Sequence, residues 1–450
     1  MSPEAIIAKL SEAVPRYTSY PTAPHFHTGI GPATTATWLR AVEAGSDISL
    51  YVHIPYCDRL CWFCACHTRM THRYEPIVEY LDALRNEIDM VGELLDGRGR
   101  VSAVHFGGGS PTMLKPDDLI GLDRMLRETF PYRDDVAFSV EIEPNDMNDE
   151  KLDTLARIGV NRASLGVQDF DPKVQAAINR EQSFALTQSV VTGLRARRIH
   201  SVNLDLLYGL PHQTVASVVA TVEQAVSLRP DRIALFGYAH VPWFKKHQTM
   251  IDEAVLPNPL QRLDQAQAAA DTIRRAGYHA VGIDHFALPG DALSNAAQAG
   301  RLHRNFQGYT DDDCQTLIGL GASSISRFRQ GYAQNTVATG AYSSQCMEGR
   351  LPIARGIALS ADDIARAWVI ERLMCDFDFS PEEAVRKFGR AAHPIIAQAT
   401  QLSADSRSGL QKTADGRFAV HPGQRLFVRT IAAEFDAYLK GGTAKHSIAV

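Results

Sequence analysis

Short apolar runs alternate with longer segments of helical periodicity from residue 48 to about residue 240 of the 450-residue chain. Val, Ile, Leu and Phe dominate the runs, as in buried strands, whereas the longer segments carry apolar residues every three to four positions. Repeated strand–helix units predict a parallel sheet covered by helices. Six runs are predicted strands: residues 48–55, 101–109, 136–144, 162–168, 201–211 and 232–240.

The clearest helical segments between these strands are residues 78–95, 117–130 and 215–228. Six strand–helix units are two short of a complete eight-unit barrel. We therefore expect an α/β protein built on a partial (β/α)6 barrel that resembles a TIM barrel.

The strand–helix rhythm fades after about residue 330, and residues 360–400 have helical patterns. The first 35 residues contain too many Pro and aromatic residues for a helix and too few charges for a solvated tail. We expect an N-terminal arm at residues 1–35, a catalytic barrel domain at residues 36–335 and a smaller, mainly helical domain at residues 336–450.

The charge balance and the N-terminus exclude several classes of protein. Lys and Arg number 46 against 51 Asp and Glu, without a long run of one sign, so we expect no nucleic-acid partner. The N-terminus lacks the pattern of a signal peptide and no run approaches 18 apolar residues, so we expect a cytoplasmic protein that does not contact a membrane. A monomer is the expected state.

Four of the seven cysteines lie within ten residues, in the stretch HIPYCDRLCWFCACHT that follows the first predicted strand. Cys57, Cys61 and Cys64 form a C-x3-C-x2-C pattern, and Cys66 follows after one further residue. Structural zinc usually takes two separated pairs of ligands, and the other three cysteines are isolated. Three thiolates on one loop suit a cubane iron–sulfur cluster whose fourth iron is left open, although zinc and unreactive thiols remain alternatives.

Several strands end in Gly-rich or polar sequence, and the ends of parallel strands meet at one mouth where active sites form. The triplet from Gly107 to Gly109 follows the second strand and permits close backbone approach or positive φ, although it can also be a simple tight turn. Glu141 and Asp205 are acids within apolar strands, which is costly unless each is paired or bound to a ligand. His53 either donates a hydrogen bond to a cluster sulfide or passes a proton, or it is merely hydrogen-bonded.

The cysteine loop after the first strand of a partial barrel resembles the radical S-adenosylmethionine (SAM) superfamily. The longer stretch YVHIPYCDRLCWFCACHT is similar to the oxygen-independent coproporphyrinogen III oxidases, as are PRYTSYPTA (15–23), GIDHFALPGD (282–291), RLHRNFQGYT (301–310), IGLGASSIS (318–326) and YAQN (332–335). These matches span nearly the whole chain. The segment VPWFKKHQ departs from the family pattern, which leaves the substrate pocket least defined.

The resemblance implies one [4Fe-4S] cluster held by Cys57, Cys61 and Cys64, with Cys66 as an accessory thiol, and two molecules of SAM. It assigns a first set of residues to the cluster-bound SAM: Tyr51, Gly108, Glu141 and Ile325. It assigns a second set to the second SAM: Phe63, Gly109, Ser110, Gln168, Arg180, Asp205 and Ala239.

The implied reaction is the oxidative decarboxylation of two propionates of coproporphyrinogen III to vinyl groups, giving protoporphyrinogen IX in haem biosynthesis. A reduced cluster cleaves SAM to a 5′-deoxyadenosyl radical, which removes hydrogen from an unactivated carbon. The electron comes from a partner protein such as a flavodoxin or ferredoxin. Arg16, Arg304 and Lys245 are candidate partners for the substrate's carboxylates by motif location.

Three alternatives remain at this point. A haem-chaperone-like branch of the superfamily shares the cluster, but the C-x-C extension and the PRYTSYPTA arm favour the oxidase. A radical methyltransferase would use the second SAM as a methyl donor. A structural zinc protein would contain no iron or sulfide.

Overall fold

A computed structural model describes residues 12–439, and its main feature is one twelve-stranded sheet. Seven neighbouring strands run parallel in the order β13-β1-β4-β5-β6-β7-β8. Their bounds are Thr316–Leu320 for β13, Asp47–Ile54 for β1, Arg100–Gly108 for β4, Tyr132–Ile142 for β5, Arg162–Gln168 for β6, Ser201–Tyr208 for β7 and Arg232–Gly237 for β8. All six predicted strands are confirmed, and β13 adds a seventh beside β1.

Antiparallel strands extend both edges of this sheet. At one edge, β14 (Ile325–Phe328), β15 (Gly331–Asn335) and β16 (Ile353–Ala358) follow β13, and at the other, β10 (His285–Ala287) and β9 (His279–Val281) follow β8. The sheet therefore continues past residue 335, where we predict a domain boundary. That boundary stays a prediction, and helix α11 (Thr339–Met347), which contacts α3 (Glu75–Leu95), also lies beyond it.

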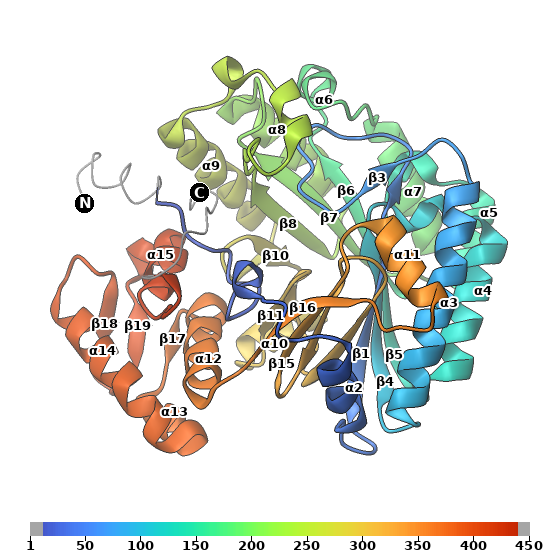
Figure 1. Cartoon of the computed structure of the whole chain (residues 1–450). Helices are drawn as coiled ribbons and strands as arrows, with labels where there is room; N and C mark the ends of the chain where they lie inside the picture. The colour runs from blue at the N-terminus through green and yellow to red at the C-terminus, as the bar shows by residue number, and fades with distance from the viewer. Residues whose placement is uncertain (1–11, 440–450) are drawn as a thin grey trace.

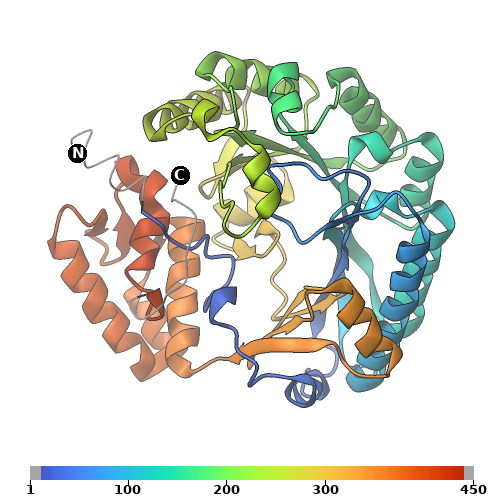
Figure 2. The ribbon, with the colours of Figure 1, turned by 45° about the horizontal axis from the view of Figure 1, so that its top comes forward.

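Helices surround the curved sheet, as Figure 2 shows from above the barrel. Besides α3 and α11, the helices around the barrel are α2 (Pro32–Arg40), α4 (Pro116–Thr129), α5 (Asp149–Arg157), α6 (Pro172–Ala177), α7 (Phe184–Ala196), α8 (Val215–Ser227), α9 (Pro259–Arg275) and α10 (Ala292–Gln298). Their starts follow local chemistry: Thr214 and Ser217, for example, form a reciprocal capping box at the start of α8. None of the helices within residues 12–439 is long and apolar enough to span a bilayer.

Alternation along the strands separates an apolar outer face from a polar inner face. In β7, Val202, Leu204 and Leu206 are buried, whereas Asn203 and Asp205 between them keep partial exposure. Successive side chains of a strand point to opposite faces, so the apolar set packs on the helices and the polar set faces the barrel interior. This pattern explains why acids occur within apolar strands.

A second unit lies beside the barrel and consists of α12 (Ala361–Asp376), α13 (Pro381–Phe388), α14 (Ala392–Ala404), α15 (Val428–Ala433) and a small sheet of order β17-β19-β18 (Figure 1). The three short strands are Asp378–Phe379, Phe418–Val420 and Leu410–Lys412, respectively. The expected mainly helical character of this part is therefore seen, with a small sheet in addition.

The N-terminal segment runs between the two units. Tyr17 Oη donates to Asp436 at 3.1 Å, and the amide of Ala437 donates to Tyr20 Oη at 3.0 Å, so the segment is fastened to the end of the second unit. Residues 1–11 of the predicted arm lie outside the described residues, and α2 begins at Pro32, inside the predicted range of the arm.

Candidate active site

The cysteine loop crosses the mouth of the barrel immediately after β1. Short strands β2 (Tyr56–Cys57) and β3 (Arg69–Met70) pair in parallel and close the loop at its base. Cys57, Cys61 and Cys64 all line a cavity of about 590 Å³ together with residues from the carboxyl ends of the parallel strands. The predicted meeting of loop and strand ends is therefore present in the structure.

Each of the three sulfurs has its own hydrogen-bond partner. Cys57 Sγ lies 2.9 Å from Thr68 Oγ1, Cys61 Sγ accepts from Arg180 Nη1 at 3.5 Å, and Cys64 Sγ accepts from the amide of Cys66 at 3.4 Å. Hydrogen bonds to sulfur are one means by which proteins stabilise and tune iron–sulfur clusters. The donor set therefore fits a cluster with three protein thiolates.

The spacing of the sulfurs argues against a single zinc ion. Within residues 12–439, one set of three possible ligands holds its ligand atoms within 4.8 Å of one another, and it consists of Asp312, Asp313 and Cys314. The loop cysteines form no such set, although four-coordinate zinc with bonds of about 2.3 Å to sulfur would require one. A cubane cluster, which spreads its ligands over separate irons, suits them better.

Burial raises the pKa of Cys57 to about 12, although the contact with Thr68 opposes the shift. The Cys57 thiolate is therefore favoured only once a cation such as iron is bound. At Cys64 the side-chain hydrogen bond from Cys66 is the main cause that lowers the pKa of the thiol. Cys66 therefore contacts Cys64, and its role as an accessory thiol stays a prediction.

The glycine-rich end of β4 allows three segments to pack closely. Gly108 has φ of +115°, and a Cβ there would lie 2.5 Å from the His53 ring, while a Cβ on Gly107 would lie 2.8 Å from the Glu141 carboxylate. The amide of Gly108 donates to Glu141 at 3.0 Å, and Ser110 Oγ donates to Asp146 at 2.5 Å. The glycines are thus needed for packing against His53 and Glu141, beyond any contact with a ligand.

Two carboxylates face the cavity in different electrostatic states. Burial alone would raise the pKa of Glu141, but the hydrogen bond from His105 at 3.1 Å and that from Gly108 hold the pKa below its usual value. Burial raises the pKa of Asp205, which accepts from Asn203 at 2.8 Å and from Ser164 at 3.1 Å. Such polar groups suit the amine and hydroxyl groups of a nucleotide cofactor.

Two residues that line this cavity each have an unsatisfied polar atom. Arg180 Nε and Asn203 Oδ1 are buried without a hydrogen-bond partner, and both residues line the cavity. Buried polar groups are normally satisfied, so each atom indicates a position where a bound molecule completes the bonding. Gln168 adds a further special feature, because it has φ of +68° at an irregularity in the pairing of β6 with β7.

His53 is held from both sides. Its Nε2 donates to the carbonyl of His67 at 2.9 Å, and its Nδ1 lies 3.0 Å from Tyr51 Oη. Burial lowers the pKa of His53 to about 4, so the ring is neutral at physiological pH. This arrangement orients the loop, and a chemical role for His53 stays a prediction.

Most of the predicted site residues converge on the cysteine cavity. Those that line it are Tyr51, His53, Phe63, Gly108, Gly109, Ser110, Glu141, Gln168, Arg180, Asp205 and Ile325, in addition to the four loop cysteines. Ala239 instead lines an adjoining cavity of about 610 Å³. Its carbonyl accepts from Gln248, which also donates to the carbonyl of Phe63, so Ala239 is linked to the loop indirectly.

Sequence reasoning missed several residues of the cavity wall, among them His105, Ser164, Asn203, Phe306 and Gln307. The first three occupy inward-facing positions of predicted strands, so the alternation contained a signal for them. Phe306 and Gln307 connect β11 (His303–Asn305) to β12 (Gly308–Thr310), and no local pattern indicates that this hairpin reaches the cavity.

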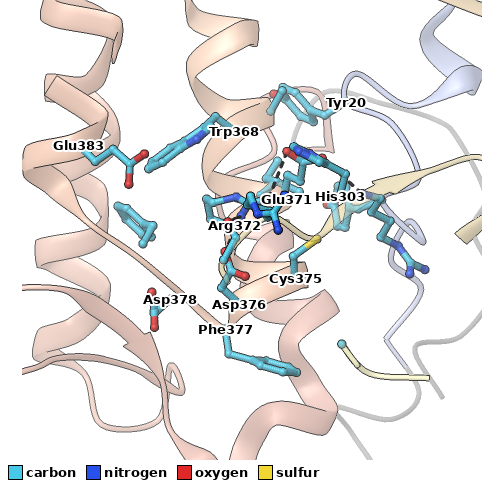
Figure 3. A pocket seen from close by; sticks show the side chains of 18 of the residues that line it. Tyr20, His303, Trp368, Glu371, Arg372, Cys375, Asp376, Phe377, Asp378 and Glu383 are labelled. Atoms are coloured by element: carbon cyan, nitrogen blue, oxygen red, sulfur yellow. Dashed lines mark hydrogen bonds and ion pairs between the residues drawn. The ribbon is translucent and has the colours of Figure 1, made fainter. Parts of the chain in front are cut away.

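Helix α12 of the second unit supports that hairpin. Glu371 accepts from the amide of Arg304 at 3.3 Å, and its carboxylate lies 3.2 Å from His303 Nδ1 (Figure 3). Arg372 donates to the carbonyl of Leu302 at 2.6 Å and pairs with Asp376 at 2.5 Å. His303, Arg304, Glu371 and Arg372 line a cavity of about 1120 Å³, which lies between the two units and includes no residue of the cysteine loop.

The three candidate partners for substrate carboxylates lie in different places. Arg16 lines both the cysteine cavity and the adjoining cavity that contains Ala239. Arg304 lines the adjoining cavity but not the cysteine cavity. Lys245 lines neither, because its ammonium donates to the carbonyl of Cys66 at 2.8 Å.

Three cysteines on the loop after the first strand of a partial barrel, with carboxylates facing the same cavity, are the features expected of the radical SAM superfamily. In agreement, residues 51–225 match the family model described as the Radical SAM superfamily. The chain is also 47% identical over 437 residues to the oxygen-independent coproporphyrinogen III oxidase of Paracoccus denitrificans, covering 97% of this chain and 96% of the relative. The corresponding Escherichia coli protein is 39% identical over 441 residues, covering 97% and 95%, respectively.

The solved structure of the Escherichia coli coproporphyrinogen III oxidase, described as a radical SAM enzyme, superposes with a TM-score of 0.89 at 37% identity. The match covers 95% of this chain and all of that chain. This chain therefore belongs to the family of oxygen-independent coproporphyrinogen III oxidases. Membership implies that it binds a [4Fe-4S] cluster and SAM.

Proposed function

We propose that this protein catalyses the oxygen-independent oxidative decarboxylation of two propionates of coproporphyrinogen III to vinyl groups, which gives protoporphyrinogen IX in haem biosynthesis. The observation that carries the proposal is the convergence of Cys57, Cys61 and Cys64 with the inward-facing carboxylates on one cavity, in a chain that matches its relatives over nearly its full length.

The cofactors and the side chains have different roles in the proposed reaction. Cys57, Cys61 and Cys64 would hold the cluster, which together with SAM supplies a carbon radical able to remove hydrogen from an unactivated carbon. The side chains supply position and a water-poor cavity. Glu141, kept ionised by His105 and Gly108, suits the amino group of SAM, and Asp205 suits ribose hydroxyls.

We infer two SAM molecules, because the two predicted sets of contacts both lie at this mouth, with Ala239 in the adjoining cavity. Equilibrium dialysis of the reconstituted enzyme with labelled SAM tests this stoichiometry. Two molecules bound per cluster are expected, and an Asp205→Asn variant should lose the second. Saturation at one molecule in the wild type would contradict the inference.

We also infer that an acidic electron-transfer protein, such as a flavodoxin or ferredoxin, docks over the cysteine loop. Residues 241–248 pack on the loop through Lys245 and through His247, whose Nε2 lies 2.7 Å from the carbonyl of Cys64. Trp243 and Phe244 are 57% and 73% exposed there. The segments 57–73 and 241–250 carry five Lys and Arg residues against one acid, so they complement an acidic surface.

Lys246→Glu tests this docking surface, because Lys246 is exposed and lies next to the loop contacts. We expect the KM for flavodoxin to rise about tenfold and its salt dependence to weaken, while turnover with a chemical reductant stays unchanged. Lys412→Glu, an exposed site in the second unit, is the matched control. An equal change in both variants would contradict the assignment.

A cytoplasmic location and a monomeric state stay predictions.

The proposed reaction is tested by anaerobic reconstitution and incubation with coproporphyrinogen III, SAM and a reductant. We expect protoporphyrin after oxidation of the product, together with 5′-deoxyadenosine. A methylated tetrapyrrole, or haem binding without any decarboxylated product, would contradict the proposal.

A further inference from the structure

A second cavity of about 610 Å³ adjoins the cysteine cavity. Arg16 and Phe236 line both, so the two spaces meet at these side chains. The walls of the second cavity come from the end of β8, from α9, from the N-terminal segment and from residues 422–429 of the second unit. It therefore lies where arm, barrel and second unit meet.

The charged side chains around this second cavity are strongly unbalanced. The lining holds six arginines and two aspartates: Arg16, Arg262, Arg274, Arg304, Arg425, Arg429, Asp271 and Asp284. Asp271 pairs with Arg274 at 2.9 Å. Asp284 lies 2.7 Å from His285 Nδ1 and 3.7 Å from Arg304. Arg262, Arg304 and Arg429 are buried and the other three arginines are exposed, so the lining carries an excess of positive charge that would attract an anion into the cavity.

Arg304, which lines both this cavity and the cavity of about 1120 Å³ between the two units, has an unsatisfied donor. Its side chain is 5% exposed, its Nε donates to the carbonyl of Arg16 at 3.4 Å, and its Nη1 is buried without any hydrogen-bond partner. A buried guanidinium N–H without a partner is rare, and a carboxylate is the acceptor that guanidinium geometry matches best.

Arg429 also lies among cations at this cavity. Its Nη2 donates to the carbonyl of Val14 at 2.7 Å and its Nε to that of Pro15 at 3.2 Å. Burial, followed by the nearby Arg16 and Arg304, lowers the pKa of Arg429 to about 9. An anion in the cavity would relieve this repulsion.

Arg304 and Arg429 together fix the arm at residues 14–16, and this sets the place of Arg16. The Arg16 side chain stays exposed and donates to the carbonyl of Gly237 at 3.2 Å, at the junction of the two cavities. The arm thereby contributes the cation at the junction of the two cavities, and the barrel and the second unit contribute the other arginines of the lining.

We propose that this arginine-lined cavity binds the propionate carboxylates of the tetrapyrrole that the reaction leaves intact. The assignment rests on the function proposed above, in which two of four propionates react and two persist in the product. A reacting propionate must lie in the cysteine cavity, and the shared wall at Arg16 and Phe236 allows one macrocycle to reach both spaces. Recognition of the persisting carboxylates would also select the orientation of the macrocycle.

Fluorescence titration of the reconstituted holoenzyme with coproporphyrin III, the air-stable tetrapropionate, tests this assignment. We expect Arg16→Gln and Arg304→Gln to weaken binding by ten- to a hundredfold, because each removes a charge-assisted hydrogen-bond donor for a carboxylate. Arg16→Lys should recover part of the affinity, because it keeps the charge without the planar fork. Arg124→Gln, an exposed side chain on α4 with the same change of charge, should bind like the wild type.

The tetramethyl ester of coproporphyrin III separates carboxylate recognition from contact with the macrocycle. It should bind weakly and equally to the wild type and to Arg16→Gln. Unchanged affinity of Arg16→Gln for the tetra-acid, or an equal loss for the ester, would overturn the assignment. If Arg304→Gln fails to fold, Arg16→Gln carries the test, because its side chain lies at the cavity surface.

Two further measurements distinguish a wrong assignment of this cavity from a wrong proposed function. Cluster absorbance and SAM binding of Arg16→Gln should match the wild type, which excludes loss of the cofactor site as the cause of weaker binding. A wild type that binds coproporphyrin III through Arg16 but does not decarboxylate coproporphyrinogen III would contradict the proposed function alone.

Discussion

Arg180 Nη1 lies 3.5 Å from Cys61 Sγ, while Nη2 of the same guanidinium lies 2.5 Å from the Glu143 carboxylate. One buried cation thus contacts both a predicted cluster ligand and a carboxylate. Burial opposes its charge, yet Glu143, followed by Cys61, raises the pKa of Arg180, so it stays protonated. The guanidinium thus places a positive charge directly beside Cys61 Sγ, with Glu143 as its counter-ion.

Replacing Arg180 by Gln should lower the reduction potential of the cluster, because a positive charge beside a ligand favours the reduced, more negative state. We expect turnover to fall by at least about tenfold, equivalent to ~1.4 kcal/mol on the barrier. Potentiometric titration followed by absorbance measures the first effect. Because Arg180→Gln leaves Glu143 uncompensated, Arg180→Gln/Glu143→Gln is the control: it should regain stability and part of the potential, since it also removes the negative charge of Glu143. An unchanged potential in both variants would refute the electrostatic role.

The four loop cysteines should respond unequally to substitution. Serine at Cys57, Cys61 or Cys64 should abolish the cluster, whereas Cys66→Ala should retain it, because the amide of residue 66 still donates to Cys64 Sγ. Iron and sulfide content of anaerobically purified variants checks this difference. Full loss of iron in Cys66→Ala would show that Cys66 is a ligand.

Gly108 should not tolerate a side chain. Its φ of +115° disfavours L residues, and a Cβ would lie 2.5 Å from the His53 ring. Gly108→Ala should therefore destabilise the protein by about 1–3 kcal/mol and impair SAM binding. Gly121→Ala is the matched control, since Gly121 lies in α4 with nothing near its Cβ position, and it should stabilise by up to about 1 kcal/mol. Thermal melts and SAM titrations compare the two, and equal behaviour would contradict the packing argument.

Glu87 on α3 should make stability depend on pH near neutrality. It is 2% exposed and accepts from Gly321 at 2.7 Å and from Tyr342 at 2.6 Å, but burial raises its pKa to about 7. The folded state therefore binds this proton more tightly than the unfolded state, and stability from this group falls as pH rises from about 4.5 to about 7. The loss amounts to about 3 kcal/mol.

Anaerobic thermal melts of the wild type and of Glu87→Gln between pH 5 and pH 7.5 isolate this contribution. The wild type should lose its advantage over the variant as the pH rises. A difference in Tm that is constant over this range, or that grows with pH, would show that Glu87 is ionised throughout.

Local sequence patterns predicted much of the fold. Alternation in β7 predicted a strand with one apolar face, and the same alternation explains why Asn203 and Asp205 reach the cavity. The cysteine spacing predicted the loop, and its place after β1 predicted that it would meet the strand ends. These features depend on neighbours in sequence, so sequence reasoning reaches them.

Long-range pairing accounts for what could not be predicted. Strand β13 lies beside β1 although more than 260 residues separate them, and nothing in either segment specifies its partner. Phe306 reaches the cavity because Glu371 of α12 holds the hairpin, and the arginine-lined cavity forms only when the arm, α9 and residues 422–429 meet. Each depends on tertiary packing rather than on a local period.

Isotope transfer from the substrate tests the central claim most directly. Coproporphyrinogen III deuterated at the propionate β-carbons should be incubated anaerobically with the reconstituted enzyme, SAM and a reductant. We predict that deuterium appears in 5′-deoxyadenosine while carbon dioxide and vinyl groups form. Vinyl product with no deuterium in 5′-deoxyadenosine, or no decarboxylation by protein that carries its full complement of iron and sulfide, would contradict the account.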